Sequence, residues 1–238
     1  MRRADPSTPT FPATLFDYNG VLADDEIVHL EAFRDALAPL GISVSKQDYV
    51  ERYLGFDDRG AFRAILADSG RALSEEELAE LSAAKKPLYF ARAELRLPTF
   101  PGAAELVRRR AEHGPVGVVS GALRDEIALG LKQLGVDALV HHVISAEDTR
   151  ACKPDPEGYV LGIARLAADI GEQKARQALV LEDSIAGVEA AKAAGLVCAA
   201  VTHSYSQAEL ERAGADLVVQ SLDELGDDLL SELFRRRG

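Results

Sequence analysis

The chain has 238 residues, of which 47% are hydrophobic and 28% are charged, and its formal net charge is −12. This balance is typical of a globular protein with a substantial core, built as one domain or as a core domain with an inserted one. The acidic charge argues against a nucleic-acid-binding protein, in which a basic patch is expected. A phosphate ligand would need a local cation: a metal ion, a lysine or a helix N-terminus.

Neither the N-terminal segment nor the cysteines indicate an exported protein. The opening "MRRADPSTPTFP" lacks the apolar stretch of a secretion signal, and we expect residues 1–12 to form a disordered leader. No segment is apolar for long enough to span a membrane. Cys152 and Cys198 imply no disulfide framework and favour a cytoplasmic protein with reduced thiols. We expect no membrane partner, and a monomer or small homo-oligomer.

The first predicted strand is the apolar run "ATLFD" at residues 13–17, and a helical stretch follows it. Residues 23–97 contain no convincing strand, and the predicted helices there are 26–41, 45–55, 58–70 and 74–95. We therefore expect a helical domain over 23–97, inserted into a core formed by 13–22 and 98–238. The connecting segments would lie near 22–26 and 97–101.

Strands and helices alternate through the rest of the chain. The predicted strands are 115–121, 178–184, 196–203 and 216–219, and the predicted helices are 102–114, 122–135, 155–171, 184–195 and 206–214. Short apolar strands between amphipathic helices predict an α/β fold, a Rossmann-like doubly wound parallel sheet covered on both faces. The predicted helices end in glycines suited to left-handed caps: Gly114, Gly135, Gly171, Gly195 and Gly214.

Polar side chains follow three of the predicted strands. Asp17 ends the first, Ser120 ends the second, and Glu182 and Asp183 end the third, while Lys153 precedes a helix. Ligands of open parallel sheets bind at the carboxyl ends of the strands. A carboxylate nucleophile, a hydroxyl, an ammonium and an acidic pair at one edge favour a phosphate-handling site.

Four motifs resemble those of the haloacid dehalogenase-like hydrolase superfamily. They occur in the family's order as "DYNGVLADDE", "VVSGA", "KPDPEGY" and "EDSIAGVEAAKAAG", and the similarity extends from about residue 13. The matching branch carries a helical cap domain after the first strand and includes β-phosphoglucomutase-like and phosphoglycolate phosphatase-like proteins. The resemblance implies an α/β core with an inserted α-helical cap, Mg²⁺ as cofactor and a small phosphorylated metabolite as substrate.

The same resemblance assigns roles to the residues of the core. Asp17 would be the nucleophile, and Ser120, Gly121 and Lys153 would hold the phosphoryl oxygens. The Mg²⁺ ligands would be Asp17, the backbone carbonyl of Asn19, Glu182 and Asp183. Phosphoryl transfer depends mainly on positioning and on neutralising charge on the equatorial oxygens, which agrees with this set.

Asn19 departs from the family pattern, in which an aspartate at this position acts as general acid and base. An amide does neither. General acid–base catalysis contributes about 10²–10⁴-fold, so turnover of poor leaving groups should be slowed by that order. Turnover of activated acyl and aryl phosphates should be slowed less. Residues a few positions after Asn19 could replace the missing group: Asp24, Asp25, Glu26 and His29.

Two related chemistries also lack this aspartate. Phosphonatases use a cap lysine, but Lys46, Lys85 and Lys86 lie outside the glycine-containing cap segment "YLGFDDRG". Dehalogenases need no metal ion, and the retained acidic pair argues against them. In the cap, the resemblance nominates Gly55, Arg59 and His29 as substrate-side residues. The cap is expected to move about its connecting segments to exclude water.

The function predicted first is a Mg²⁺-dependent phosphatase acting through an aspartyl-phosphate, slow or selective because of Asn19. The alternatives are an impaired phosphate-ligand-binding protein, which Asn19 favours, and a β-phosphoglucomutase-like phosphotransferase, which Asn19 disfavours.

Overall fold

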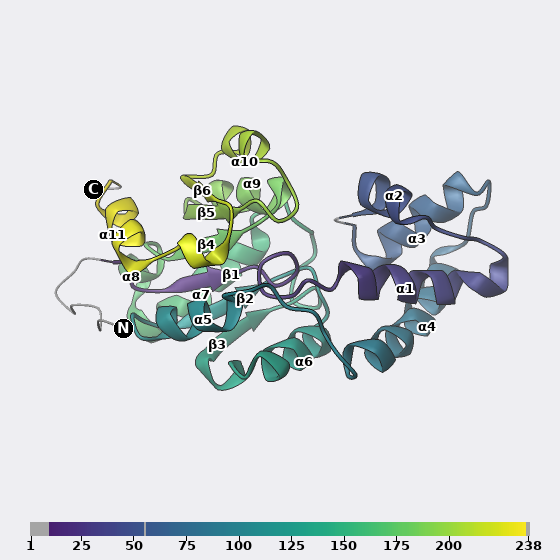
Figure 1. The fold of residues 1–238 in the computed structure, drawn as a ribbon, viewed down its shortest axis with the longest axis horizontal. Coiled ribbons are helices and arrows are strands. Elements are labelled where there is room, and N and C mark those ends of the chain that lie inside the picture. The colour runs from purple at the N-terminus through teal and green to yellow at the C-terminus, as the bar shows by residue number, and fades with distance from the viewer. Residues whose placement is uncertain (1–9, 55, 237–238) are drawn as a thin grey trace. The chain divides into compact units, whose positions relative to one another are not determined.

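The computed structural model describes residues 10–54 and 56–236. The chain divides into two compact units, a helical unit over Asp24–Pro98 and a core unit formed by the chain before and after it. Figure 1 shows the helical unit as a set of helices and the core unit around a sheet. The helical unit differs by one residue at each end from the cap domain expected at 23–97.

The core unit contains a six-stranded parallel sheet in the order β3-β2-β1-β4-β5-β6. Its strands are β1 Thr14–Phe16, β2 Val116–Val119, β3 Val140–Ile144, β4 Leu179–Glu182, β5 Val197–Val201 and β6 Leu217–Val219. Because the order reverses between β1 and β4, these two strands flank the switch point at which ligands bind in such sheets. The prediction of a doubly wound parallel sheet is confirmed.

Strand β3 was not predicted from the sequence. Its residues "VHHVI" include two histidines and are mostly half-buried, because the strand lies at one edge of the sheet. An edge strand packs less of its surface than a central one, so it lacks the continuous apolar run that identifies β1 or β4.

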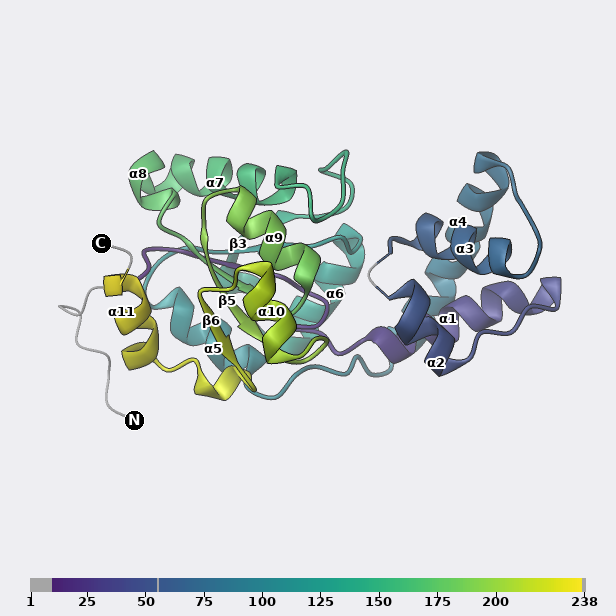
Figure 2. The same ribbon diagram turned by 90° about the horizontal axis from the view of Figure 1, so that it is seen from above.

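Helices cover both faces of the sheet (Figure 2). Leu15 and Val180 point toward α7 and α9, where they join one apolar cluster with Ile163 and Val188. On the opposite face, Nε of Arg110 in α5 donates to Oγ1 of Thr14 at 3.0 Å. The helices of the core are α5 Ala103–Ala111, α6 Arg124–Leu134, α7 Glu157–Ile170, α8 Glu172–Ala175, α9 Ile185–Ala193, α10 Gln207–Ala213 and α11 Asp227–Arg236.

The expected leader falls mainly outside the described part of the chain, which begins at residue 10. Phe11, which the sequence analysis placed in that leader, is instead fully buried. Its ring packs edge-on against Phe234 with centroids 5.1 Å apart, and its carbonyl accepts a hydrogen bond from Arg110 at 2.8 Å. The folded core therefore begins before residue 12.

The helical unit has an apolar core of its own, which includes Leu30, Phe33, Phe62 and Leu66. Its helices are α1 Glu26–Leu37, α2 Lys46–Asp48, α3 Asp58–Asp68 and α4 Glu75–Ala93, with a π-helix at Tyr49–Tyr53. Helix α4 begins at a capping box in which Ser74 and Glu77 bond reciprocally.

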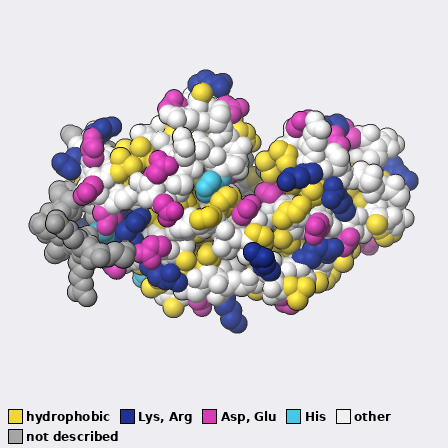
Figure 3. Space-filling model, in the orientation of Figure 1, with side chains coloured by type: hydrophobic (Ala, Val, Ile, Leu, Met, Phe, Trp, Pro, Cys, Tyr) yellow, Lys and Arg dark blue, Asp and Glu magenta, His cyan; other side chains and the backbone are white. Residues whose placement is uncertain are grey.

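No helix in the described ranges is both long and apolar enough to cross a membrane. On the face drawn in Figure 3, Lys and Arg side chains are scattered among Asp and Glu, and no broad basic patch is visible there.

Candidate active site

Three carboxylates meet at the switch point of the sheet. Asp17 directly follows β1, Glu182 ends β4, and Asp183 comes next, and one oxygen from each lies within 4.8 Å of the others. Phe16 pairs with Leu181 in the parallel register, and the Asp17 amide donates to the Leu181 carbonyl at 2.9 Å. The carboxylates are adjacent because two neighbouring parallel strands end at the same level.

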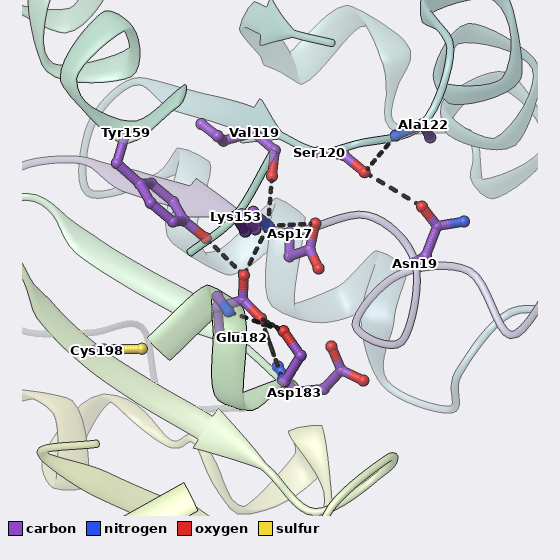
Figure 4. A network of polar contacts seen from close by, with 12 residues as sticks. Asp17, Asn19, Val119, Ser120, Ala122, Lys153, Tyr159, Glu182, Asp183 and Cys198 are labelled. Atoms are coloured by element: carbon purple, nitrogen blue, oxygen red, sulfur yellow. Dashed lines mark hydrogen bonds and ion pairs between the residues drawn. The ribbon is translucent and has the colours of Figure 1, made fainter. Parts of the chain in front are cut away.

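Lys153 supplies the cation of this cluster (Figure 4). Its ammonium lies 2.8 Å from Oδ1 of Asp17 and 2.6 Å from Oε1 of Glu182, and it donates to the Val119 carbonyl at 3.1 Å. The loop before α7 thereby ties together the ends of β1, β2 and β4. Burial alone would lower the pKa of Lys153, but the two carboxylates raise it above its ordinary value.

Glu182 is surrounded by donors. Besides Lys153, the Tyr159 hydroxyl donates to it at 2.8 Å, and the amides of Asp183 and Ser184 donate to its other oxygen at 3.0 and 3.2 Å. Burial raises the pKa of Glu182, but Lys153 and these hydrogen bonds lower it below its ordinary value. A Cβ at Gly187 would lie 1.8 Å from Oε1 of Glu182, so only glycine leaves room for this carboxylate.

Asp17 and Asp183 carry the charge that is not neutralised. Burial and the Glu182 charge raise the pKa of Asp17 to about 7, and Lys153 offsets this only in part. Burial, Glu182 and Asp17 together raise the pKa of Asp183 well above its ordinary value. Three carboxylates face one ammonium, and a divalent cation would remove the imbalance. Mg²⁺ prefers oxygen ligands of this kind, so the residues present fit a magnesium site.

Asn19 and Ser120 lie on the other side of Asp17. The Ser120 hydroxyl donates to Oδ1 of Asn19 at 3.2 Å and accepts from the Ala122 amide at 3.1 Å. Gly121 and Ser120 line a cavity of about 30 Å³, which has room for water but not for a metabolite. The structure thus brings together the predicted core residues Asp17, Asn19, Ser120, Gly121, Lys153, Glu182 and Asp183.

The predicted substrate-side residues Gly55, Arg59 and His29 belong to the helical unit. Gly55 lies outside the described residues, and Arg59 is exposed. The His29 ring bonds within its own unit: Nδ1 lies 2.9 Å from the buried ammonium of Lys85, and Nε2 lies 3.3 Å from Asp25. Because an ammonium only donates, Nδ1 accepts and Nε2 carries the proton. Lys85 also forms an ion pair with Asp58. This lysine therefore contacts the cap segment "YLGFDDRG", although it lies outside that segment in the sequence.

Three residues near the carboxylates were not nominated from the sequence. Tyr159 belongs to the "KPDPEGY" motif but was given no role. The Ser204 hydroxyl donates to Oδ2 of Asp183, and Nδ1 of His203 donates to the Gly20 carbonyl at 2.7 Å. Ser204 and His203 follow β5 within three residues, and this position at the carboxyl edge of the sheet was the available signal.

The fold and the site define an α/β protein with a buried acidic centre, able to hold a metal ion, at the carboxyl ends of parallel strands. The profile of the haloacid dehalogenase-like hydrolases matches residues 11–195. The chain belongs to this family, as its motifs predicted.

Individual relatives place it in the expected branch. Validoxylamine A 7′-phosphate phosphatase of Streptomyces hygroscopicus subsp. limoneus is 32% identical over 217 residues, covering 90% of this chain and 96% of that protein. The crystal structure of a D-to-N variant of CbbY from Rhodobacter sphaeroides, in complex with xylulose-(1,5)bisphosphate, has a TM-score of 0.77 at 27% identity, covering 91% and 96% of the two chains.

β-Phosphoglucomutase from Clostridium difficile shares the fold, with a TM-score of 0.79 at 21% identity and coverage of 95% and 98% of the two chains. A further relative is much longer. Protein SUPPRESSOR OF QUENCHING 1 of Arabidopsis thaliana is 28% identical over 230 residues, and 93% of this chain spans 20% of that protein.

Proposed function

We propose that the chain is a Mg²⁺-dependent phosphatase that hydrolyses a phosphoric monoester of a small metabolite through phosphorylation of Asp17. The observation that carries the proposal is the position of Asp17 beside both the Lys153 ammonium, 2.8 Å away, and the acidic pair Glu182 and Asp183. Support also comes from the relatives, since one is named as a phosphatase and another was solved with a sugar bisphosphate. The two free cysteines agree with a cytoplasmic location.

In this mechanism a carboxylate oxygen of Asp17 attacks phosphorus, and the bond from phosphorus to the leaving oxygen breaks. Lys153 and the Ser120 hydroxyl bind the phosphoryl oxygens and hold the group in line. Water then attacks phosphorus, and the bond to Asp17 breaks and regenerates the carboxylate. Asp17, Asp183 and the Asn19 carbonyl would hold Mg²⁺ with Glu182 behind them, and the ion would neutralise charge on the phosphoryl oxygens.

Asn19 sets the range of substrates in this proposal. Its amide keeps a hydrogen bond to Ser120 but has no proton to give to a leaving oxygen. The leaving oxygen therefore takes its proton from water, which favours esters with good leaving groups.

The test is phosphate release with Mg²⁺ from acetyl phosphate, an aryl phosphate and a panel of alkyl phosphates. The protein should be active mainly on the activated esters, and Asn19→Asp should gain about 10²–10⁴-fold on the alkyl ones. Asp17→Ala should abolish release from every substrate. Unchanged release by Asp17→Ala would refute the mechanism. If phosphate analogues bind but neither protein turns over, the phosphate-binding function that Asn19 favours replaces the phosphatase.

A further inference from the structure

The loop between β5 and α10 contacts the candidate metal site through two adjacent side chains, to which the mechanism above gives no part. His203 donates to the Gly20 carbonyl, and Ser204 donates to the Asp183 carboxylate. Gly20 directly follows Asn19, whose backbone carbonyl is a candidate metal ligand. Two consecutive residues of one loop therefore each hold a different part of the site.

Ser204 orients the Asp183 carboxylate. Among the described residues, its hydroxyl is the one hydrogen-bond donor to that carboxylate, and it donates to Oδ2. The neighbouring Glu182 carboxylate, in contrast, is held by an ammonium, a phenol and two backbone amides. Because a bond to Oδ2 restrains rotation of the carboxylate, the Ser204 hydroxyl also fixes the direction of Oδ1, which is left for a metal ion.

His203 holds the backbone against which Asp183 lies. Its Nδ1 donates to the Gly20 carbonyl at 2.7 Å, and a Cβ added at Gly20 would lie only 2.0 Å from Oδ2 of Asp183. The His203 ring stacks on Phe100, with centroids 3.8 Å apart and planes 7° from parallel, which restrains the imidazole. The loop therefore fixes the Asp183 carboxylate and the Gly20 backbone relative to each other.

Helix capping does not explain these contacts. Helix α10 has a capping box of its own, formed by Ser206 and Glu209. Ser204 is exposed, so its side chain adds little to packing, yet its hydroxyl is bonded to the buried carboxylate of Asp183. The contact therefore acts on the position of that carboxylate.

Fixed ligand positions matter more for a small ion than for a large one. Mg²⁺ demands near-ideal octahedral geometry with oxygens at about 2.0–2.1 Å, whereas Ca²⁺ accepts flexible arrangements with oxygens at about 2.3–2.6 Å. Loss of a group that orients a metal ligand typically costs about 10–100-fold in metal affinity. Loosening the carboxylate and the backbone carbonyl of this site should therefore weaken Mg²⁺ binding more than Ca²⁺ binding.

We propose that His203 and Ser204 are positioning residues that give the site its preference for Mg²⁺ over Ca²⁺. They hold the Asn19–Gly20 backbone and the Asp183 carboxylate at the spacing that the smaller ion requires. The inference rests on the Mg²⁺ dependence in the proposed function and adds the residues that select the ion.

The test is titration calorimetry of Mg²⁺ and of Ca²⁺ on the full chain, which needs no turnover. Ser204→Ala removes the donor to Asp183. His203→Phe removes the donor to Gly20 and keeps an aromatic ring to stack on Phe100. Each variant should weaken Mg²⁺ binding about tenfold and Ca²⁺ binding less than about threefold, so that the preference for Mg²⁺ falls.

Two further variants separate positioning from a loss of stability. Ser204→Thr keeps the hydroxyl and should keep the preference for Mg²⁺. Ser206→Ala is the matched control, because it removes a hydroxyl of the same loop that donates to Glu209 at 2.5 Å in the cap of α10. Ser206→Ala should lower the thermal unfolding midpoint and leave both metal affinities unchanged.

Equal losses for the two ions, or an unchanged Mg²⁺ affinity, in Ser204→Ala and His203→Phe would overturn the inference. A selective loss in only one of these variants would overturn the role of the other residue. Loss of the preference in Ser204→Thr, or in the control Ser206→Ala, would show that any disturbance of the loop has this effect and would also overturn it.

The outcome is separable from that of the proposed function. Selective loss of Mg²⁺ affinity in these variants, without turnover by the unmodified protein, would refute the phosphatase alone. Mg²⁺-dependent turnover with equal losses for the two ions would refute the positioning role alone. Absence of Mg²⁺ binding by the unmodified protein would refute both.

Discussion

The ammonium of Lys153 lies 2.8 Å from a carboxylate oxygen of Asp17. It is the only lysine or arginine among the described residues with an ion pair to Asp17 or Glu182. The balance of charge around the proposed nucleophile therefore depends on a side chain from a loop 136 positions further along the chain.

Lys153→Met should abolish most phosphate release while the chain remains folded with bound Mg²⁺. Loss of one preorganised charge at a phosphoryl group costs about 10²–10³-fold in turnover, and here it also leaves Glu182 and Asp17 unopposed. The measurement is Mg²⁺-dependent release from acetyl phosphate. Lys174→Met, at an exposed lysine of α8, is the matched control and should leave the rate unchanged. Equal rates for the two variants would show that Lys153 does not act on the phosphoryl group.

The raised pKa of Asp17 predicts how stability depends on pH without metal. The pKa is about 7 in the folded chain and 3.8 as the ordinary value, so the folded state binds the proton more tightly. The stability that this tighter proton binding provides is fully present below the unfolded pKa and is lost as the pH rises through about 7. In EDTA, Asp17→Asn should therefore stabilise the protein most at pH 8, and the gain should shrink toward pH 5.

Thermal unfolding of both proteins at several pH values checks this, and the difference between them removes the titration of all other groups. Each pKa unit corresponds to about 1.4 kcal/mol. Adding Mg²⁺ should raise the unfolding midpoint of the unmodified protein more at pH 8 than at pH 5. A gain for Asp17→Asn that is the same at both pH values would contradict the raised pKa.

Gly20→Ala should impair Mg²⁺ binding as well as folding. The backbone at Gly20 has φ +80°, and an added Cβ would lie 2.0 Å from Oδ2 of Asp183. Gly41→Ala is a matched control, because Gly41 has φ +69° but nothing within 4 Å of its added Cβ. Both variants should lose about 1–2 kcal/mol from the left-handed backbone, but only Gly20→Ala should also weaken Mg²⁺ binding in calorimetry. Equal Mg²⁺ affinities of the two variants would show that a side chain at Gly20 does not disturb Mg²⁺ binding.

Tyr159→Phe should lower both stability and Mg²⁺ affinity. The buried Tyr159 hydroxyl donates to Glu182 at 2.8 Å, and hydrogen bonds to charged groups contribute about 1.5–3 kcal/mol. Tyr89 offers the matched control, because its buried hydroxyl donates to Asp25 at 2.7 Å in the helical unit. Tyr89→Phe should destabilise to a similar degree and leave Mg²⁺ affinity in the core unchanged. Chemical unfolding and calorimetry of the two variants measure both effects.

The sequence predicted what short-range patterns determine. The alternation of apolar strands and amphipathic helices was enough for the doubly wound sheet, and Asp17 and the acidic pair lie together because β1 and β4 end at the same level. Strand β3 was missed because burial at a sheet edge leaves little apolar signal. Individual contacts between distant segments were not predicted, even where a position at the carboxyl edge of the sheet was indicated. His203 and Gly20 are 183 positions apart, and no sequence pattern in either segment indicates that the two residues form a hydrogen bond.

The attachment of the helical unit has an evolutionary consequence. Ala23 pairs with Thr99 in an antiparallel bridge, and the Asp24 amide donates to the Pro98 carbonyl at 2.9 Å, so the two chain crossings lie side by side. The strands of the core keep their order whatever is joined between these crossings. The segment between them can therefore be lengthened, shortened or exchanged by recombination while the phosphate chemistry is inherited intact.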